Sequence, residues 1–278
     1  MIDSKIPTAS YGILQQSSAN CESDGIVEQV ERLGYAILDS GWGAAELESF
    51  ADAFDKTRRQ YIAVHGETRL RDKNEFHTIR LPLVHGDPAF LKLAVNDKLQ
   101  SALRRLISGK FILNQQNGLI NPPRETSSQA AWHRDLPYQH FVSSRPLAIN
   151  ALFCVDDFTR ENGATFVLPG SHRAEDFPTQ QYLRQNALQV EAKAGSFIVL
   201  DCMVFHAAGS NGTNAERRAV NHVFTIPYFK QQIRIAGNID SANLSSAEME
   251  MLGFDFNEPE SIEAYLSGRP DTSGRDSQ

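Results

Sequence analysis

From about residue 110 onward, the sequence consists of short apolar runs separated by turn residues. The turns contain Asn-Gly, Pro-Gly-Ser and Ala-Gly-Ser, which favour tight reversals of the chain. Several short strands at this spacing are typical of an antiparallel barrel or jelly roll, and not of alternating βαβ units. We therefore expect strands over residues 111–114, 147–155, 165–168, 187–192, 197–200 and 219–228.

The first third of the chain follows a different pattern, in which apolar residues recur at the spacing of amphipathic helices. Asp87 and Pro88 suit the start of one of these helices. We expect a short strand at 35–38 and helices at 25–33, 44–64 and 88–107, with two further short helices at 245–252 and 259–266. The predicted fold class is α+β, with a mainly helical region packed on a jelly-roll core.

The helical part (about 25–109) and the β core (about 110–230) are expected to form a single domain over residues 25–267. Residues 1–24 have few large apolar side chains and are predicted to form a tail or a cover strand. The polar residues 268–278 are predicted to be disordered. No G-x-G-x-x-G or G-K-[ST] motif occurs, so nothing in the sequence favours nucleotide binding.

Charge and apolar content exclude several broad classes of protein. The net charge of −7, from 27 basic and 34 acidic residues, argues against a general binder of nucleic acid or of anionic membranes. No apolar run approaches the 18 or so residues of a membrane span, and the N-terminus lacks the pattern of a secretory signal. Three widely spaced cysteines form no disulfide framework, and we expect Cys154 and Cys202 to be buried, reduced thiols. A cytoplasmic protein is the expectation.

The segment Trp132-His133-Arg134-Asp135 places an imidazole and a carboxylate two residues apart. In an extended chain both side chains point to one face, and together they supply two of the three ligands of a facial metal triad. Such a pair alone is weak evidence for a metal site. From the residues alone, the third ligand stays open among His140, His172, His206 and His222.

An arginine at the start of the apolar run 219–228 is a candidate for binding an anion. Arg217 and Arg218 both enter this run, and alternation along a strand directs only one of them inward. A buried guanidinium needs a partner, which the carboxylate of a bound small acid would provide through a two-pronged contact. The residues themselves do not decide between the two arginines. His222 lies on the opposite strand face from Arg217 and is expected to be structural.

These features, in this order, resemble the phytanoyl-CoA dioxygenase family of non-haem Fe(II), 2-oxoglutarate-dependent oxygenases. The resemblance is carried by H-x-D, Asp156-Asp157, Glu161-Asn162-Gly163-Ala164-Thr165, Leu168-Pro169-Gly170-Ser171-His172, Gly195-Ser196, His206 and Arg217. It is strong over about 110–230. It implies a double-stranded β-helix (jelly-roll, cupin-like) core and the use of Fe(II), 2-oxoglutarate and O2.

The resemblance also implies roles for individual residues. His133, Asp135 and His206 would bind iron, and Arg217 would pair with the distal carboxylate of 2-oxoglutarate. Further candidates for holding 2-oxoglutarate are Thr165, Asn114, Gln116 and Gln129. Family members often have a glutamine three residues before the first metal histidine, where this chain has Ala130. Because halogenating relatives have a small residue in place of Asp135, its presence favours hydroxylation.

Two alternative functions have less support in the sequence than an oxygenase. A non-catalytic jelly-roll protein that binds a metal and a ligand has no chemical need for all four site residues. A zinc hydrolase lacks support because no H-E-x-x-H helix is present. The expected substrate is a small organic molecule, and residues 66–75 and 138–145 are expected to form the mouth of the site. No basic cluster marks a nucleotide tail such as that of acyl-CoA, and the oligomeric state is left open.

Overall fold

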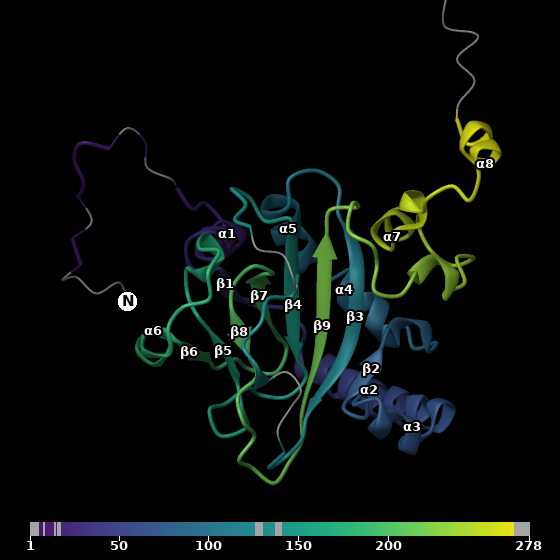
Figure 1. Ribbon diagram of the computed structural model, residues 1–278, viewed down its shortest axis with the longest axis horizontal. Coiled ribbons are helices and arrows are strands. Elements are labelled where there is room, and N and C mark those ends of the chain that lie inside the picture. The colour runs from purple at the N-terminus through teal and green to yellow at the C-terminus, as the bar shows by residue number, and fades with distance from the viewer. Residues whose placement is uncertain are drawn as a thin grey trace, which may run out of the picture.

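The computed structural model describes residues 6–7, 9–13, 15, 18–125, 130–136 and 141–269 (Figure 1). Its centre is formed by two antiparallel sheets. The larger sheet has the order β1-β7-β4-β9-β3-β2 and the smaller one the order β6-β5-β8. This arrangement is the predicted jelly-roll core with a helical N-terminal region.

The strands match the predicted apolar runs, with β3 extending well beyond its predicted end. The larger sheet consists of β1 (Tyr35–Asp39), β2 (Thr78–Arg80), β3 (Ile112–Asn121), β4 (Ala148–Cys154), β7 (Ser196–Asp201) and β9 (Arg217–Thr225). The smaller sheet consists of β5 (Thr165–Val167), β6 (Leu188–Val190) and β8 (His206–Ala207). The short strand β2 was not predicted.

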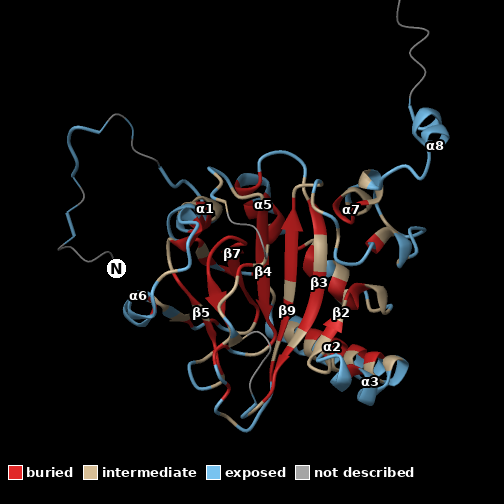
Figure 2. Ribbon diagram, viewed as in Figure 1, coloured by how far each residue is buried: buried red, intermediate tan, exposed pale blue. Residues whose placement is uncertain are grey.

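Strands β4 and β7, in the middle of the larger sheet, are buried on both faces, as their red colour in Figure 2 shows. Alternate residues of β4, β7 and β9 face the helices: Ile149, Ala151, Phe153, Phe197, Val199, Val220 and Phe224. The intervening residues face the smaller sheet and include Leu152, Cys154, Ile198, Leu200 and Ala219. The alternation therefore separates a helix-facing core from an inner layer, and the inner layer is where a ligand pocket can form.

The helices that pack on the larger sheet come from the N-terminal third of the chain. They are α1 (Glu22–Leu33), α2 (Ala44–His65), α3 (Glu67–Asp72), α4 (Ala89–Ala94) and α5 (Asp97–Leu106). Later helices are α6 (Gln180–Asn186), α7 (Ser246–Met251) and α8 (Ile262–Ser267). Within the described ranges, none of these helices is long and apolar enough to cross a membrane.

The prediction of one helix over 88–107 is wrong, because the chain forms two helices separated at Val95 and Asn96. Asn96 has an extended ψ of 126°, and its side chain accepts a hydrogen bond from the backbone N–H of Leu99, which caps α5. The apolar periodicity continues across the break because Leu93 and Leu99 pack in the same core. Periodicity alone therefore concealed the boundary.

Replacing Asn96 by alanine is expected to destabilise the protein by about 1–2 kcal/mol, since it removes the cap of α5. It also removes a buried hydrogen bond from Asn96 Nδ2 to the carbonyl of Ser40, at 3.0 Å. Urea unfolding measures the loss. The matched control is Asn186→Ala on exposed α6, which should change stability by less than about 0.5 kcal/mol. Equal effects of the two substitutions would contradict the assignment of Asn96 as a cap.

Cys154 and Cys202 are buried and free, as predicted, and Cys21 is free and exposed. Burial raises the pKa of the Cys202 thiol well above its ordinary value. Both buried cysteines are therefore protonated packing residues at neutral pH.

Candidate active site

Backbone hydrogen bonds bring the H-x-D segment against His206. The N–H of His133 donates to the carbonyl of His206 at 3.0 Å, and the N–H of His206 donates back at 3.1 Å. The N–H of Asp135 donates to the carbonyl of Cys202 at 3.1 Å. The segment thus adds an isolated bridge beside β8, and the three predicted ligand residues come together from distant parts of the chain.

The two imidazoles are held in the same way. Nδ1 of His133 lies 2.8 Å from the carbonyl oxygen of Ala131, and Nδ1 of His206 lies 3.1 Å from that of Val204. A ring nitrogen that faces a carbonyl oxygen carries the proton, so Nε2 of each ring keeps its lone pair. Burial lowers the pKa of His206, which favours the neutral form that binds metals.

The third donor is the carboxylate of Asp135, whose Oδ1 lies 3.7 Å from Nε2 of His206. The candidate ligand atoms of His133, Asp135 and His206 all lie within 4.8 Å of one another. Across the part of the chain that the structure describes, they are the one such group of three. Two imidazoles and a carboxylate suit a divalent transition metal and leave further coordination positions for other ligands.

Arg134, between the two ligand residues, points away from the metal donors. Its guanidinium is buried, lies 4.0 Å from the centre of the Phe205 ring, and donates to the carbonyls of Met203, Ser171, Ala174 and Glu175. These bonds tie the H-x-D segment to the Pro-Gly-Ser-His turn and to the residues before His206. The ligands are therefore positioned by a rigid, fully bonded support.

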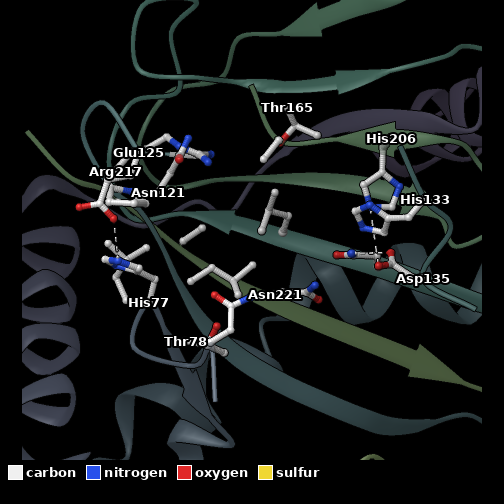
Figure 3. Close-up of a pocket in the computed structure, with 18 of the residues that line it drawn as sticks. His77, Thr78, Asn121, Glu125, His133, Asp135, Thr165, His206, Arg217 and Asn221 are labelled. Atoms are coloured by element: carbon white, nitrogen blue, oxygen red, sulfur yellow. Dashed lines mark hydrogen bonds and ion pairs between the residues drawn. The ribbon is translucent and has the colours of Figure 1, made fainter. Parts of the chain in front are cut away.

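A cavity of about 230 Å³ opens from these donors between the two sheets. Its inner wall includes Asn150, Leu152, Leu200, Ala219 and Asn221 of the larger sheet, together with Thr165 of β5. In Figure 3 the three donors lie at one end of the cavity and Arg217 at the other, with Thr165 between them in this view. The mouth is lined by Arg71, Asn74, Phe76, His77, Thr78 and Glu125.

Arg217 lines this cavity and has no acidic partner among the residues that the structure describes. It is 7% exposed, and its Nε and Nη1 atoms have no hydrogen-bond partner among the described residues. Its guanidinium lies over the ring of Phe158, 3.8 Å from the ring centre. Burial lowers its pKa to about 10, so it remains protonated at neutral pH. A buried charge of this kind requires an anionic partner.

Arg218 points the other way and is fully paired. It donates to both carboxylate oxygens of Asp156, at 3.0 and 2.7 Å, and lies 2.9 Å from a carboxylate oxygen of Asp55 on α2. These acidic partners raise the pKa of Arg218. Of the two arginines, Arg217 is therefore the one that faces the cavity.

Two predicted contacts to 2-oxoglutarate do not line the cavity. Asn114 donates to the carbonyl of Lys230 at 2.9 Å, outside the site. Gln116 is fully buried on the helix-facing side, where it bonds the carbonyl of Phe90 and the ring of His222. Thr165 does line the cavity, whereas Gln129 lies outside the described residues.

Three polar features of the cavity were not singled out from the sequence. Asn150 donates from Nδ2 to Oδ2 of Asp135 at 2.7 Å. Asn221 lines the wall with an Oδ1 that has no partner among the described residues. His77 and Glu125 approach to 3.4 Å at the mouth. The sequence signal that could have identified such residues is a polar side chain at an inward-facing position of an otherwise apolar strand. Asn150 in Ala148–Cys154 is an example.

Comparisons with known proteins agree with this geometry. The model of the family described as "Phytanoyl-CoA dioxygenase (PhyH)" matches residues 30–219. An uncharacterised protein of Mycobacterium tuberculosis is 35% identical over 219 residues, which cover 77% of this chain and 79% of that protein.

Solved structures share the fold. EctD from S. alaskensis, crystallised with 2-oxoglutarate and 5-hydroxyectoine, superposes with a TM-score of 0.61 at 22% identity, covering 72% of this chain and 74% of that one. The α-ketoglutarate-dependent epimerase SnoN from nogalamycin biosynthesis superposes with a TM-score of 0.59 at 17% identity, covering 80% and 91%. From the extent of the family match and the identity to its relatives, the chain belongs to the phytanoyl-CoA dioxygenase family.

Proposed function

We propose that this protein is an Fe(II)- and 2-oxoglutarate-dependent dioxygenase that hydroxylates an unactivated C–H bond of a small organic molecule. The observation that carries the proposal is the presence, in one cavity, of a His-Asp-His donor group and an unpaired buried arginine. The donor group fits Fe(II), and the arginine fits the free carboxylate of a dicarboxylic acid. Membership of a dioxygenase family supports the same assignment.

Different residues would bind the iron and the co-substrate, at opposite ends of the cavity. Nε2 of His133, Nε2 of His206 and Oδ1 of Asp135 would hold the iron, because the ligand atoms of these residues lie within 4.8 Å of one another while Nδ1 of each ring faces a carbonyl oxygen. These residues would place the iron where it could supply the activation of O2, with one oxygen atom going to succinate and the other to the substrate as 2-oxoglutarate loses CO2.

The far end of the cavity is suited to the co-substrate. Arg217 would form a two-pronged ion pair with the distal carboxylate of 2-oxoglutarate, and the hydroxyl of Thr165 would add a hydrogen bond. Phe158 supports the guanidinium from behind, so the arginine is positioned before the co-substrate arrives. The apolar side chains of Leu152 and Leu200 also line the cavity and would limit the access of water to the bound co-substrate.

Hydroxylation is proposed over halogenation because Asp135 supplies a third protein ligand. The substrate would enter past the polar mouth, where Arg71, Asn74 and His77 offer hydrogen-bonding groups, and would meet Asn221 on the inner wall. Arg71 and Asn74 lie in 66–75, one of the two stretches predicted to form the mouth; of the other, 138–145, residues 141–145 do not line the cavity and 138–140 lie outside the described residues.

The test is the formation of succinate from 2-oxoglutarate by protein reconstituted with Fe(II) under argon and then exposed to O2. We expect slow, iron-dependent succinate formation without substrate, and faster formation with members of a substrate panel. A panel compound that stimulates turnover should gain one oxygen atom. Tight binding of iron and 2-oxoglutarate with no succinate under any condition would instead favour a non-catalytic binding protein.

A further inference from the structure

The second carboxylate oxygen of Asp135 is held by a residue that none of the family motifs includes. Asn150 lies in the middle of β4, is 2% exposed, and directs its side chain to the inner layer between the two sheets. Its Nδ2 donates to Oδ2 of Asp135 at 2.7 Å. A hydrogen bond to a carboxylate at this distance is charge-assisted and strong.

This contact makes the two oxygens of Asp135 inequivalent. Oδ1 lies 3.7 Å from Nε2 of His206 and faces the metal donors, whereas Oδ2 is turned toward Asn150. Only the amide nitrogen of Asn150 can donate to a carboxylate, so the orientation of the amide is fixed. Its Oδ1 is then left buried, lining the cavity, with no partner among the described residues.

From these contacts, and on the basis of the proposed function, we propose that Asn150 is a positioning residue that makes Asp135 a one-oxygen ligand of the iron. A carboxylate can bind a metal through one oxygen or through both. If both oxygens of Asp135 bound, the protein would fill four of six positions and leave too few for a two-point co-substrate together with O2. Asn150 prevents this by engaging Oδ2.

The place of Asn150 in β4 argues that its role is in the site and not in packing. Neighbouring inward residues of β4, such as Leu152, are apolar. The unpartnered oxygen of its buried amide carries a desolvation penalty that an apolar side chain would avoid. If this position served packing alone, we would expect an apolar residue such as leucine.

The test compares Asn150→Leu with Asn117→Leu. Asn117 on β3 is also a buried asparagine, at 4% exposed, with an unpartnered Oδ1 among the described residues, but its Nδ2 donates to Gln232 at 3.3 Å and not to a metal ligand. The measurements are the melting temperature without metal, the Fe(II) dissociation constant under argon, and succinate formation at saturating Fe(II) and 2-oxoglutarate.

For Asn150→Leu we expect a lower melting temperature without metal, because Oδ2 of the buried Asp135 loses its hydrogen-bond donor. Fe(II) affinity and saturated turnover should each fall by about 10- to 100-fold, the usual effect of removing a hydrogen bond to a metal ligand. Asn117→Leu should leave both within about threefold. Asn150→Ala, which creates no steric conflict, should behave like Asn150→Leu and serves if the leucine variant does not fold.

Unchanged Fe(II) affinity and turnover in the folded Asn150 variants would overturn the proposal. The proposal would also be overturned if Asn150→Leu and Asn117→Leu lost Fe(II) affinity and turnover to the same extent, in proportion to the fall in their melting temperatures. Absence of succinate from the wild-type protein would instead count against the proposed function, while the Fe(II) affinities would still report on Asn150.

Discussion

Replacing Arg217 by methionine is expected to weaken 2-oxoglutarate binding by about 2–5 kcal/mol, the usual loss when one partner of a buried, hydrogen-bonded charge pair is removed. This corresponds to an increase in the dissociation constant of about 30-fold to several thousand-fold. The physical reason is that no other basic residue among those described shares the inner wall of the cavity with Arg217. Anaerobic isothermal titration calorimetry on the iron-loaded protein measures the change.

The same substitution should not destabilise the protein without ligands. Arg217 is buried with two nitrogen atoms unpartnered among the described residues, so an apolar chain of similar length removes an uncompensated charge. The matched control is Arg218→Met. It breaks the contacts to Asp156 and Asp55 and should cost about 1–2 kcal/mol of stability, with 2-oxoglutarate affinity nearly unchanged. The opposite pattern in the two variants would show that Arg218 binds the co-substrate.

Replacing His206 by alanine is expected to lower Fe(II) affinity by more than about 100-fold, because loss of a direct ligand exceeds the 10- to 100-fold loss typical of its supporting residues. Succinate formation should become undetectable. The control is His222→Ala, which removes another buried histidine from a strand of the same core. His222 bonds Gln116 and the carbonyl of Ala151 on the helix-facing side of the larger sheet.

We expect His222→Ala to reduce stability while Fe(II) affinity stays unchanged. Anaerobic Fe(II) titration of both variants, with unfolding curves measured in parallel, separates loss of a ligand from loss of the fold. Fe(II) binding by His206→Ala as tight as that of the wild-type protein would contradict the metal site.

The sequence predicted the strands well because their apolar runs are short and separated by strong turn signals. It predicted the convergence of His133 and Asp135 because alternation along an extended segment is a local property. The choice of His206 as third ligand came from resemblance to a family, since several histidines were equally acceptable from the residues alone. The structure brings His206 to the other two through a bridge that no local pattern encodes.

The misplacement of Gln116 has a local cause. The register of β3 against β9 shifts between Leu113 and Gln115, so the alternation that begins at the strand start changes face. After the shift, Gln116 pairs with His222 and faces the helices. A bulge of this kind leaves no clear signal in the run Ile112–Asn121.

The other unpredicted features depend on long-range contacts. The role of Asn150 depends on its hydrogen bond to Asp135. Arg218 is held away from the cavity by its contacts with Asp156 and Asp55. Sequence alone could identify a polar residue in an apolar strand and two competing arginines. It could not supply the partners that decide their roles.

A crystal structure of the protein with Fe(II) and 2-oxoglutarate, obtained under argon, tests the central claim most directly. We expect iron bound to Nε2 of His133, Nε2 of His206 and Oδ1 of Asp135, with the distal carboxylate of 2-oxoglutarate paired to Arg217. Iron bound by other residues, or the distal carboxylate held at the mouth by Arg71 with Arg217 still unpaired, would contradict it.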